Sequence, residues 1–434
     1  MVNFILDLLL KQILGTPFIL IAIIVFVGYA AMKQPFGKSL TGAIKAAIGM
    51  LVLGVGSSQL IANFGALLTA LTKQFGVKGV LMDTYSTMVA CNQSLGDYAS
   101  WSIYTLLVAF LVNILLVAFR KYTKIRSVFL TGNVMVVQAA IATYIVYRFL
   151  HTPSLSTIFI AGVITALYWG IMSTLLIKPT HEITGADFTI GHQQMLGSLL
   201  AYKIAGKVGN PKDDIERKKL PGFLSIFQDN IVASAMVFLI SVTVIFIAMG
   251  GKTVTAMAGT TNIVIYTIKT ALTLAANIYI LLAGVRMLVG ELMISFKGFS
   301  EKLLPGAVVA VDCAATYGFA PKSVILGFLF GAFGQIAGVL ALLAFHSPFL
   351  VIVGFIPMFF DNATIGIFAN KKGGWKAAAG ITFCSGIIQV VGTALAASMM
   401  GLSFWQGSFD WATIWVAIIA ALKGIGALLG IPVV

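Results

Sequence analysis

The sequence has little charge, and this shortage is its most informative property. Only 10% of the 434 residues are charged, whereas soluble domains carry roughly a quarter. Hydrophobic residues make up 59% of the chain. A soluble globular protein is excluded, because there is too little polar sequence to cover a core. We therefore expect an all-α polytopic membrane protein, in which membrane insertion uses up the length and leaves no room for a soluble catalytic domain.

Cysteine is scarce too, and several motifs are missing. Cys91, Cys313 and Cys384 are an odd number with no C-x-x-C spacing, so neither a disulfide framework nor a zinc site is indicated. The chain has no Walker loop, no G-x-G-x-x-G stretch and no serine or cysteine catalytic constellation. ATP-driven transport by this chain alone is thereby excluded, and we expect no catalytic residue, no metal and no cofactor. No stretch resembles a cleaved signal peptide.

Acidic residues are half as many as basic ones, 14 against 28, which gives a net charge of +14. In a membrane protein such an excess usually lies in cytoplasmic loops. A span needs about 20 apolar residues. We predict eleven spans, at about residues 16–32, 38–56, 97–119, 126–150, 155–177, 225–249, 263–285, 322–345, 350–370, 377–400 and 412–430. Basic and nearly neutral connections alternate between them, which predicts an outer amino terminus and a cytoplasmic carboxyl terminus.

One acid lies in a stretch that the membrane should cover. Asp312 sits among small apolar residues between Pro305 and Pro321, and a carboxylate at membrane depth costs about 2.5–3.5 kcal/mol on insertion scales. Broken backbone at that depth survives only inside protein or beside a wet cavity. We predict a re-entrant hairpin over 303–323, two short helical pieces whose non-helical tip presents Asp312 to a substrate. The alternative is a tilted helix whose aspartate pairs with a buried lysine or hydroxyl.

A second polar stretch, 82–101, matches the first in position. Its Asp83 follows Gly54 by 29 residues, and Asp312 follows Gly284 by 28. The charge pattern places the two runs on opposite sides, so we predict inverted repeats over about 16–177 and 225–400, followed by a last helix at 412–430. The alternatives are chance alignment of small residues and, for 82–101, an outer loop that is merely wet.

Other polar residues could complete a site for a hydroxyl-rich solute. Asn133 and Gln138 lie in one predicted span, and Asp361 and Asn362 lie comparably in another, although amides in such helices often only bond a neighbouring helix. The segment 178–194 precedes a helix expected to end near Val208. It carries these polar and charged residues: His181, Glu182, Asp187, His192, Gln193 and Gln194. The His and Glu spacing fits no helical zinc motif, so hydrogen bonding to a polyol suits His192 and Gln193 better. We expect the charged stretch 203–219 to be a solvated face, with a docking surface as the alternative.

At these residues the chain resembles enzyme IIC, the membrane component of the L-ascorbate phosphotransferase systems of bacteria. The resemblance covers nearly the whole chain and is carried by DTYSTM (83–88), GDYASW (96–101), LTGNVMVVQ (130–138), YWGIMS (168–173), KPTHEIT (178–184), FTIGHQQ (188–194), LPGFLSIFQDNIV (220–232), LLPGAVVAVDCAA (303–315) and GFIPMFFDNATIGIFANKKGGW (354–375). It implies a homodimer of eleven-span protomers, each divided into a scaffold and a core that moves like an elevator and carries both hairpins.

The resemblance also implies where the substrate binds. Substrate contacts would fall at Thr84, Tyr85, Asn133, Val137, Gln138, His192, Gln193 and Asp312. The family pattern has a histidine in place of Asn133 and a glutamine in place of Val137. The substrate is then a related sugar acid, or it is held by fewer polar contacts.

The predicted function is a permease of the bacterial cytoplasmic (inner) membrane that takes up L-ascorbate. Separate soluble phosphoryl-carrier subunits, enzymes IIA and IIB, would phosphorylate it; membrane lipid is the other expected partner, and nucleic acid is not one. The rival is a gradient-driven symporter of a sugar acid, in which Asp312 and Asp361 take up a proton or sodium ion. A lipid-modifying enzyme is disfavoured, because the hairpins hold no paired base and nucleophile.

Overall fold

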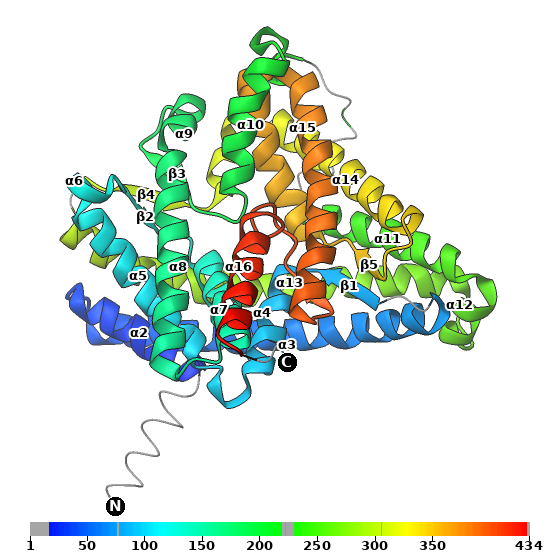
Figure 1. The fold of residues 1–434 in the computed structure, drawn as a ribbon, viewed down its shortest axis with the longest axis horizontal. Coiled ribbons are helices and arrows are strands. Elements are labelled where there is room, and N and C mark those ends of the chain that lie inside the picture. Colours follow the sequence, from blue (N-terminus) through cyan, green and yellow to red (C-terminus); the bar gives the residue numbers. More distant parts are fainter. Residues whose placement is uncertain (1–16, 76–77, 219–221, 223–229, 305, 432–434) are drawn as a thin grey trace, which may run out of the picture.

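The computed structural model describes residues 17–75, 78–218, 222, 230–304 and 306–431 (Figure 1). Within these ranges six helices are long and apolar enough to cross a membrane. The count is seven if Phe238–Met249 and Gly251–Ala258, which meet at a bend of 116°, are one span. Three shorter apolar helices lie at Ile21–Ala31, Ile263–Asn277 and Ile414–Leu428. The chain is therefore mostly helical and polytopic. Pro305 and residues 223–229 of the predicted elements lie outside the described residues.

Each of the eleven predicted stretches contains a helix. The helices are α2 (Pro17–Ala31), α3 (Phe36–Phe75), α4 (Thr84–Leu95), α5 (Trp101–Ala118), α6 (Arg120–Thr123), α7 (Gly132–Leu150), α8 (Ser154–Leu175), α9 (Ile177–Thr184), α10 (Met195–Val208), α11 (Asn230–Met249), α12 (Gly251–Ala258), α13 (Ile263–Leu303), α14 (Pro321–Ala344), α15 (Asn362–Met400) and α16 (Ile414–Leu428). The helix α10 ends at Val208, as predicted. Short 3₁₀ helices lie at Gly96–Tyr98, Pro211–Asp213, Ile215–Arg217 and Cys313–Phe319, and a π-helical turn at Pro357–Asp361 precedes α15.

The long helix α15 is two helices in one run. Gly374 has φ 72° and ψ −179° inside it, a backbone conformation open to glycine and strained for other residues. The predicted spans 350–370 and 377–400 are therefore separated by a glycine break with no loop between them. A second expected loop, 250–260, is mostly the helix α12.

The two longest helices, α3 and α13, pack against each other along one side of the molecule. Gly49 lies so close to the α13 backbone that a Cβ there would overlap Leu288. Gly42 faces Glu291, whose carboxylate accepts a 2.5 Å hydrogen bond from the Tyr29 hydroxyl on α2. Gly42 contacts Glu291, and the later residue Gly49 contacts the earlier residue Leu288, so α3 and α13 are antiparallel. Together with α2, α11 and α12 they form one group of helices, with α3 running along the lower edge of Figure 1.

The remaining long helices form a second group. In Figure 1, α8, α10 and α15 stand across the direction of α3. Close backbone contact joins α14 to α15, because a Cβ at Gly327 would overlap Asn362 and one at Gly334 would overlap Phe383. The stretch expected to be a solvated face is partly docked here, since Glu216 accepts a 2.7 Å hydrogen bond from the Ser323 backbone N–H at the start of α14.

Six short strands form two parallel sheets that the helical prediction missed. The strands are β1 (Lys78–Met82), β2 (Ser127–Phe129), β3 (Phe188–Ile190), β4 (Val308–Val311), β5 (Phe349–Ile352) and β6 (Phe404–Trp405). One sheet has the order β5-β1-β6 and the other β2-β4-β3. Lys78 is opposite Phe349 and Leu81 opposite Phe404, while Val308 is opposite Ser127 and Val309 opposite Phe188.

Two predictions are corrected by these sheets. The first arm of the 303–323 stretch is a strand and not a short helix, because three of the four residues Val308–Val311 are β-branched and the backbone N–H and C=O groups of this run pair with β2 and β3. For the same reason the tilted-helix alternative is wrong. The segment 401–410, expected to be an outer connection, contributes β6 and is buried from Trp405 to Asp410.

The order of elements in the first half recurs in the second. A long helix, a short strand, an aspartate and a short helix occur as α3, β1, Asp83 and α4, and again as α13, β4, Asp312 and the 3₁₀ helix Cys313–Phe319. The strands β2 and β3 of the first half flank β4, and the strands β5 and β6 of the second half flank β1. Each sheet thus has its central strand from one half and its edges from the other.

Candidate functional site

Two aspartates begin the helices that follow the two central strands. Asp83 accepts a 2.7 Å hydrogen bond from the Ser86 backbone N–H at the start of α4. Asp312 accepts one of 2.9 Å from the Ala314 N–H at the start of the 3₁₀ helix. Such N-capping occupies backbone donors that the helix itself cannot pair. Both aspartates thus hold a turn in place; Asp83 is buried, whereas Asp312 is half-buried.

The predicted residues His192 and Asp312 lie together. Ligand atoms of His192, Asp312 and Cys313 are all within 4.8 Å of one another. The His192 ring stacks on Phe360 with centroids 6.1 Å apart, and its Nδ1 lies 2.5 Å from Gln194 Oε1. Nδ1 is thus engaged by Gln194, which leaves Nε2 as the ring nitrogen available to another group.

Gln193 connects the His192 cluster to the first hairpin through the turn after β6. Its side-chain Oε1 accepts a 3.1 Å hydrogen bond from the Ser408 hydroxyl. Two residues further along the chain, the Asp410 backbone N–H donates to the Gln193 carbonyl over 3.1 Å. Before this turn, the Trp405 carbonyl accepts a 2.9 Å bond from the Asp83 N–H. The turn after β6 therefore joins Asp83, next to the predicted residues Thr84 and Tyr85, to Gln193.

Thr84 and Tyr85 are buried at 2% and 4% exposure. The Thr84 hydroxyl has no hydrogen-bond partner within the described part of the chain. A buried hydroxyl of this kind normally finds a partner, so Thr84 is free to bond a solute that enters the site.

Asn133, Val137 and Gln138 lie on α7, which packs against α4. Asn133 is partly exposed, whereas Val137 is buried in the apolar core at 1% exposure. Gln138 Oε1 accepts a 2.5 Å hydrogen bond from the Trp169 indole on α8, while its amide nitrogen has no partner among the described residues. The amide oxygen of Gln138 thus holds α7 against α8, and its amide nitrogen is unpaired among the described residues.

Sequence reasoning missed one buried carboxylate beside these residues, that of Asp410. The Asp410 carboxylate accepts from the Leu196 and Gly197 N–H groups at the start of α10, at 3.0 and 3.3 Å, and from the Tyr168 hydroxyl at 2.5 Å. Asp361, which the sequence did single out, accepts a 2.6 Å bond from the Phe409 N–H. No local signal marked Asp410, because its partners lie over 200 residues away.

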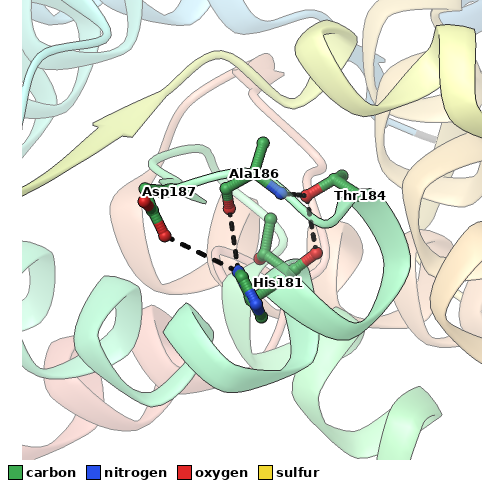
Figure 2. A network of polar contacts seen from close by, with 5 residues as sticks. His181, Thr184, Ala186 and Asp187 are labelled. Carbon is green, nitrogen blue, oxygen red and sulfur yellow. Dashed lines mark hydrogen bonds and ion pairs between the residues drawn. The ribbon is translucent and has the colours of Figure 1, made fainter.

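His181 lies in a separate surface network (Figure 2). Its Nδ1 is 3.7 Å from an Asp187 carboxylate oxygen and 3.3 Å from the Ala186 carbonyl oxygen, both in the turn that ends α9. His181 and Glu182 therefore do not join the His192 cluster among the described residues. Glu182 instead pairs with Lys372 at 2.8 Å and with Tyr202, and the hydrogen bond from Lys372 is the main reason that its pKa is lowered.

The arrangement has the chemistry of a binding site. It offers hydroxyl, amide, imidazole and carboxylate groups from both halves of the chain, next to the aromatic ring of Phe360. Donors and acceptors of this mixture suit a solute with several hydroxyl groups, whereas an apolar solute would leave them unpaired.

Comparisons with known proteins show the family of this chain. The family model EIIC-GAT, described as "PTS system sugar-specific permease component", matches residues 12–413. A relative named "Ascorbate-specific PTS system EIIC component", from Mycoplasma pneumoniae, is 34% identical over 428 residues, covering 88% of this chain. The chain spans 65% of the length of that relative. With its helical membrane architecture and a family match over nearly its whole length, this chain belongs to the family of sugar-specific permease components of the phosphotransferase system.

Proposed function

We propose that this chain carries L-ascorbate across the membrane as the enzyme IIC of a phosphotransferase system. The single observation that carries this proposal is the family match over residues 12–413 together with a relative named as ascorbate-specific. The cluster of His192, Gln193 and Asp312 supports it, because these side chains can both donate to and accept from the hydroxyl groups of a sugar acid.

The two departures from the family pattern, Asn133 and Val137, reduce the polar contacts that α7 can offer to a substrate. Val137 is sealed in the apolar core, so it gives the substrate no polar contact. Asn133 is partly exposed and can still donate and accept with its amide. Thr84 and Gln138 each keep a buried polar atom without a partner among the described residues. Ascorbate would therefore be held with fewer polar contacts from α7 and with the remaining ones from the first hairpin.

The chemistry that makes uptake irreversible belongs to other subunits. Soluble enzymes IIA and IIB would pass a phosphoryl group to a substrate hydroxyl on the cytoplasmic side, forming the ester bond as the bond to the carrier breaks. The ester has gained charge and cannot recross the bilayer. The role of this chain is then to bind ascorbate and present it.

The proposed architecture is eleven spans with two re-entrant hairpins, built from inverted repeats over about 16–177 and 225–400 and a last helix at 412–430. The recurrence of elements and the exchange of strands between the two sheets support it. The antiparallel pair α3 and α13 would belong to the scaffold, and the hairpins with α7, α8, α14 and α15 would belong to a core that moves as an elevator. The two groups of helices described above are consistent with that division.

The proposed setting is the bacterial cytoplasmic (inner) membrane, with the amino terminus outside, the carboxyl terminus inside and lipid around a homodimer. The alternation of basic and neutral connections supports the orientation. We place the dimer contact on the scaffold, because a moving core cannot also be the fixed contact.

Uptake of labelled L-ascorbate into membrane vesicles tests the function. We expect accumulation as the phosphate ester only when phosphoenolpyruvate and the soluble carriers are both present, and we expect it to survive collapse of the proton and sodium gradients. Vesicles from cells lacking the chain are the control. Accumulation of unmodified ascorbate driven by a gradient, with no carriers, would overturn the proposal in favour of a symporter.

A further inference from the structure

The segment Phe404–Asp410 lies where the first hairpin and the His192 segment meet. Its strand β6 pairs with β1, with Leu81 opposite Phe404 and Met82 opposite Trp405. Its turn contains Gly407 with φ 69°, a conformation that favours glycine. A side chain there would overlap Met82. The turn is thus pressed against the end of β1, immediately before Asp83.

This segment matches Phe188–Gln194 of the first half in several ways. Both begin with a strand at the edge of a sheet whose central strand precedes a capping aspartate. Both place a glycine three residues after the phenylalanine, in FTIGHQQ and FWQGSFD. The first of them supplies His192 and Gln193 to the site. The second lies against the site from the other half of the chain, in a segment that the sequence predicts to be an outer connection.

Gln406 is the unusual residue of this segment. It is 0% exposed, and neither its amide nitrogen nor its amide oxygen has a hydrogen-bond partner among the described residues. Buried side-chain amides are normally paired. The hydroxyls of Thr84 and Thr393 also lack a partner among the described residues. Thr393 lies next to Gly407, and Thr84 follows Asp83, whose N–H donates to the Trp405 carbonyl. Unpaired polar atoms therefore gather around the β6 turn.

The contacts on either side of Gln406 show what it is near. Trp405, just before it, accepts the Asp83 N–H, and Ser408, two residues after it, donates to Gln193. Gln406 is thus held between the backbone of the first hairpin and a residue that the binding site uses. Its backbone position is fixed, and its side-chain amide is uncommitted.

We propose that Gln406 is a substrate-contacting residue that sets specificity, donating from its amide nitrogen and accepting at its amide oxygen with hydroxyl groups of the sugar acid. This inference rests on the proposed function and names one further contact at the same site. A hydroxyl both donates and accepts, so one glutamine can satisfy it in both senses. The amide has no partner among the described residues, and substrate would supply one.

The test compares Gln406→Leu with the matched control Gln335→Leu. Gln335 is also 0% exposed, but its amide nitrogen donates to Gln389 over 2.8 Å. Binding of labelled L-ascorbate to purified full-length protein is measured with the thermal unfolding midpoint, with and without ascorbate. We expect Gln406→Leu to weaken binding about tenfold or more while the ligand-free midpoint stays the same or rises, because an unpaired buried amide has been replaced by an apolar group. Gln335→Leu should lower the midpoint and leave affinity nearly unchanged.

A deoxy analogue of ascorbate gives the second measurement. If Gln406 bonds the hydroxyl that is removed, the analogue binds wild type more weakly than ascorbate does, and Gln406→Leu binds both alike. Equal ascorbate affinity in wild type and Gln406→Leu would overturn the inference, and so would a loss of ligand-free stability in both Gln406→Leu and Gln406→Met. A wild-type protein that binds no ascorbate would instead overturn the proposed function, so the two failures are distinguishable.

Discussion

The two aspartate turns are built alike and covered differently. In the first, Asp83 and Thr84 are both 2% exposed and lie under the β6 turn. In the second, Asp312 is half-buried and Phe319, at the end of its 3₁₀ helix, is 49% exposed. Both aspartates cap the helix that follows, but Asp83 bonds the N–H three residues on and begins an α-helix, whereas Asp312 bonds the N–H two residues on and begins a 3₁₀ helix. The cover differs as well. The structure is therefore closed over the first turn and open beside the second.

This difference indicates the direction of access. If substrate binds at Asp312, as proposed, it would approach from the side of the second turn, because Asp312 is partly exposed there, whereas Thr84, Tyr85, His192 and Gln193 are all buried. With the orientation proposed above, the open side faces the cytoplasm, where the phosphoryl carriers act. The predictions below test this asymmetry, beginning with the largest effect.

We expect the largest effect from removing the Asp410 carboxylate, which joins the turn after β6 to the start of α10. Asp410→Ala leaves the Leu196 and Gly197 N–H groups without their acceptor and leaves the Tyr168 hydroxyl only the His192 carbonyl, at 3.5 Å. Each buried unpaired group costs about 1–3 kcal/mol, so we expect a loss of stability of about 3 kcal/mol or more. The thermal unfolding midpoint in detergent measures it. Asp410→Asn, which keeps one acceptor oxygen, is the control and should lose less; equal midpoints for wild type and Asp410→Ala would show that the cover is not anchored there.

The same substitution in both turns should have opposite outcomes. We expect Asp312→Asn to keep the fold and to weaken ascorbate binding by about ten- to hundredfold, since a hydrogen bond to a charged group contributes about 1.5–3 kcal/mol. Asp83→Asn should mainly lower the unfolding midpoint, because its carboxylate is enclosed. Binding titration and thermal unfolding separate the two.

Asp187→Asn, at a fully exposed carboxylate on the surface network, is the control for charge removal and should change neither quantity. Unchanged binding by Asp312→Asn together with collapsed expression would make Asp312 a structural residue.

Labelling should report the open side directly. In a Cys384→Ser background, Phe319→Cys places a thiol at an exposed position of the second turn, and Thr87→Cys places one at a position of the first that is 0% exposed. We expect a membrane-impermeant maleimide to modify Thr87→Cys about tenfold or more slowly, because a buried thiol is protected. The label should reach Phe319→Cys only from the cytoplasmic side of the membrane. Equal labelling rates at both positions would show that the two turns are equally accessible.

The smallest effect is a pH dependence at the base of the β3 segment. The hydrogen bond from Lys372, and then that from Tyr202, lowers the pKa of Glu182. The ion pair therefore stabilises the folded state fully above the usual pKa of glutamate, and this contribution is lost as pH falls through the lowered folded pKa. The pair is partly exposed, so we expect only about 0–1 kcal/mol.

Thermal unfolding of wild type and Glu182→Gln between neutral and acidic pH checks this. The variant should lack the acid-dependent part of the decrease. Parallel curves would show that the Lys372 pair contributes nothing to holding the segment.

Much of this architecture could be predicted from local sequence. The spacing from Gly54 to Asp83, and from Gly284 to Asp312, marked two matching runs that each lead to an aspartate, and in the structure each aspartate follows a strand and caps a helix; the inverted repeat inferred from this spacing stays a prediction. A histidine followed by two glutamines, at the end of a glycine-containing turn, predicts hydrogen bonding to a polyol at His192 and Gln193, and this stays a prediction; the structure places His192 beside Asp312. Local composition is sufficient to mark such residues, because these features depend on neighbours in sequence.

The strands and the β6 turn could not be predicted in this way. A run such as Val308–Val311 is too short to distinguish strand from buried helix by periodicity, and only its pairing with β2 and β3 decides. The hydrogen bond from Tyr168 to Asp410 joins residues 242 apart, so the sequence near Asp410 gives no signal of it. Val137 was expected at the ligand, but nothing in its local sequence reveals that it is sealed in the core.

The exchange of strands between the sheets has a consequence for biosynthesis. The strand β1 starts at Lys78, while its partners start at Phe349 and Phe404, so 271 residues (349 − 78) separate it from the first. While the ribosome makes that length, the edges of β1 have no native partner, and unpaired strand edges invite mispairing. Closing so long a loop is slow. We therefore expect the first half, released alone, to leave β1 open to proteolysis, and expect the nascent chain to depend on insertion factors until the strand β5 emerges.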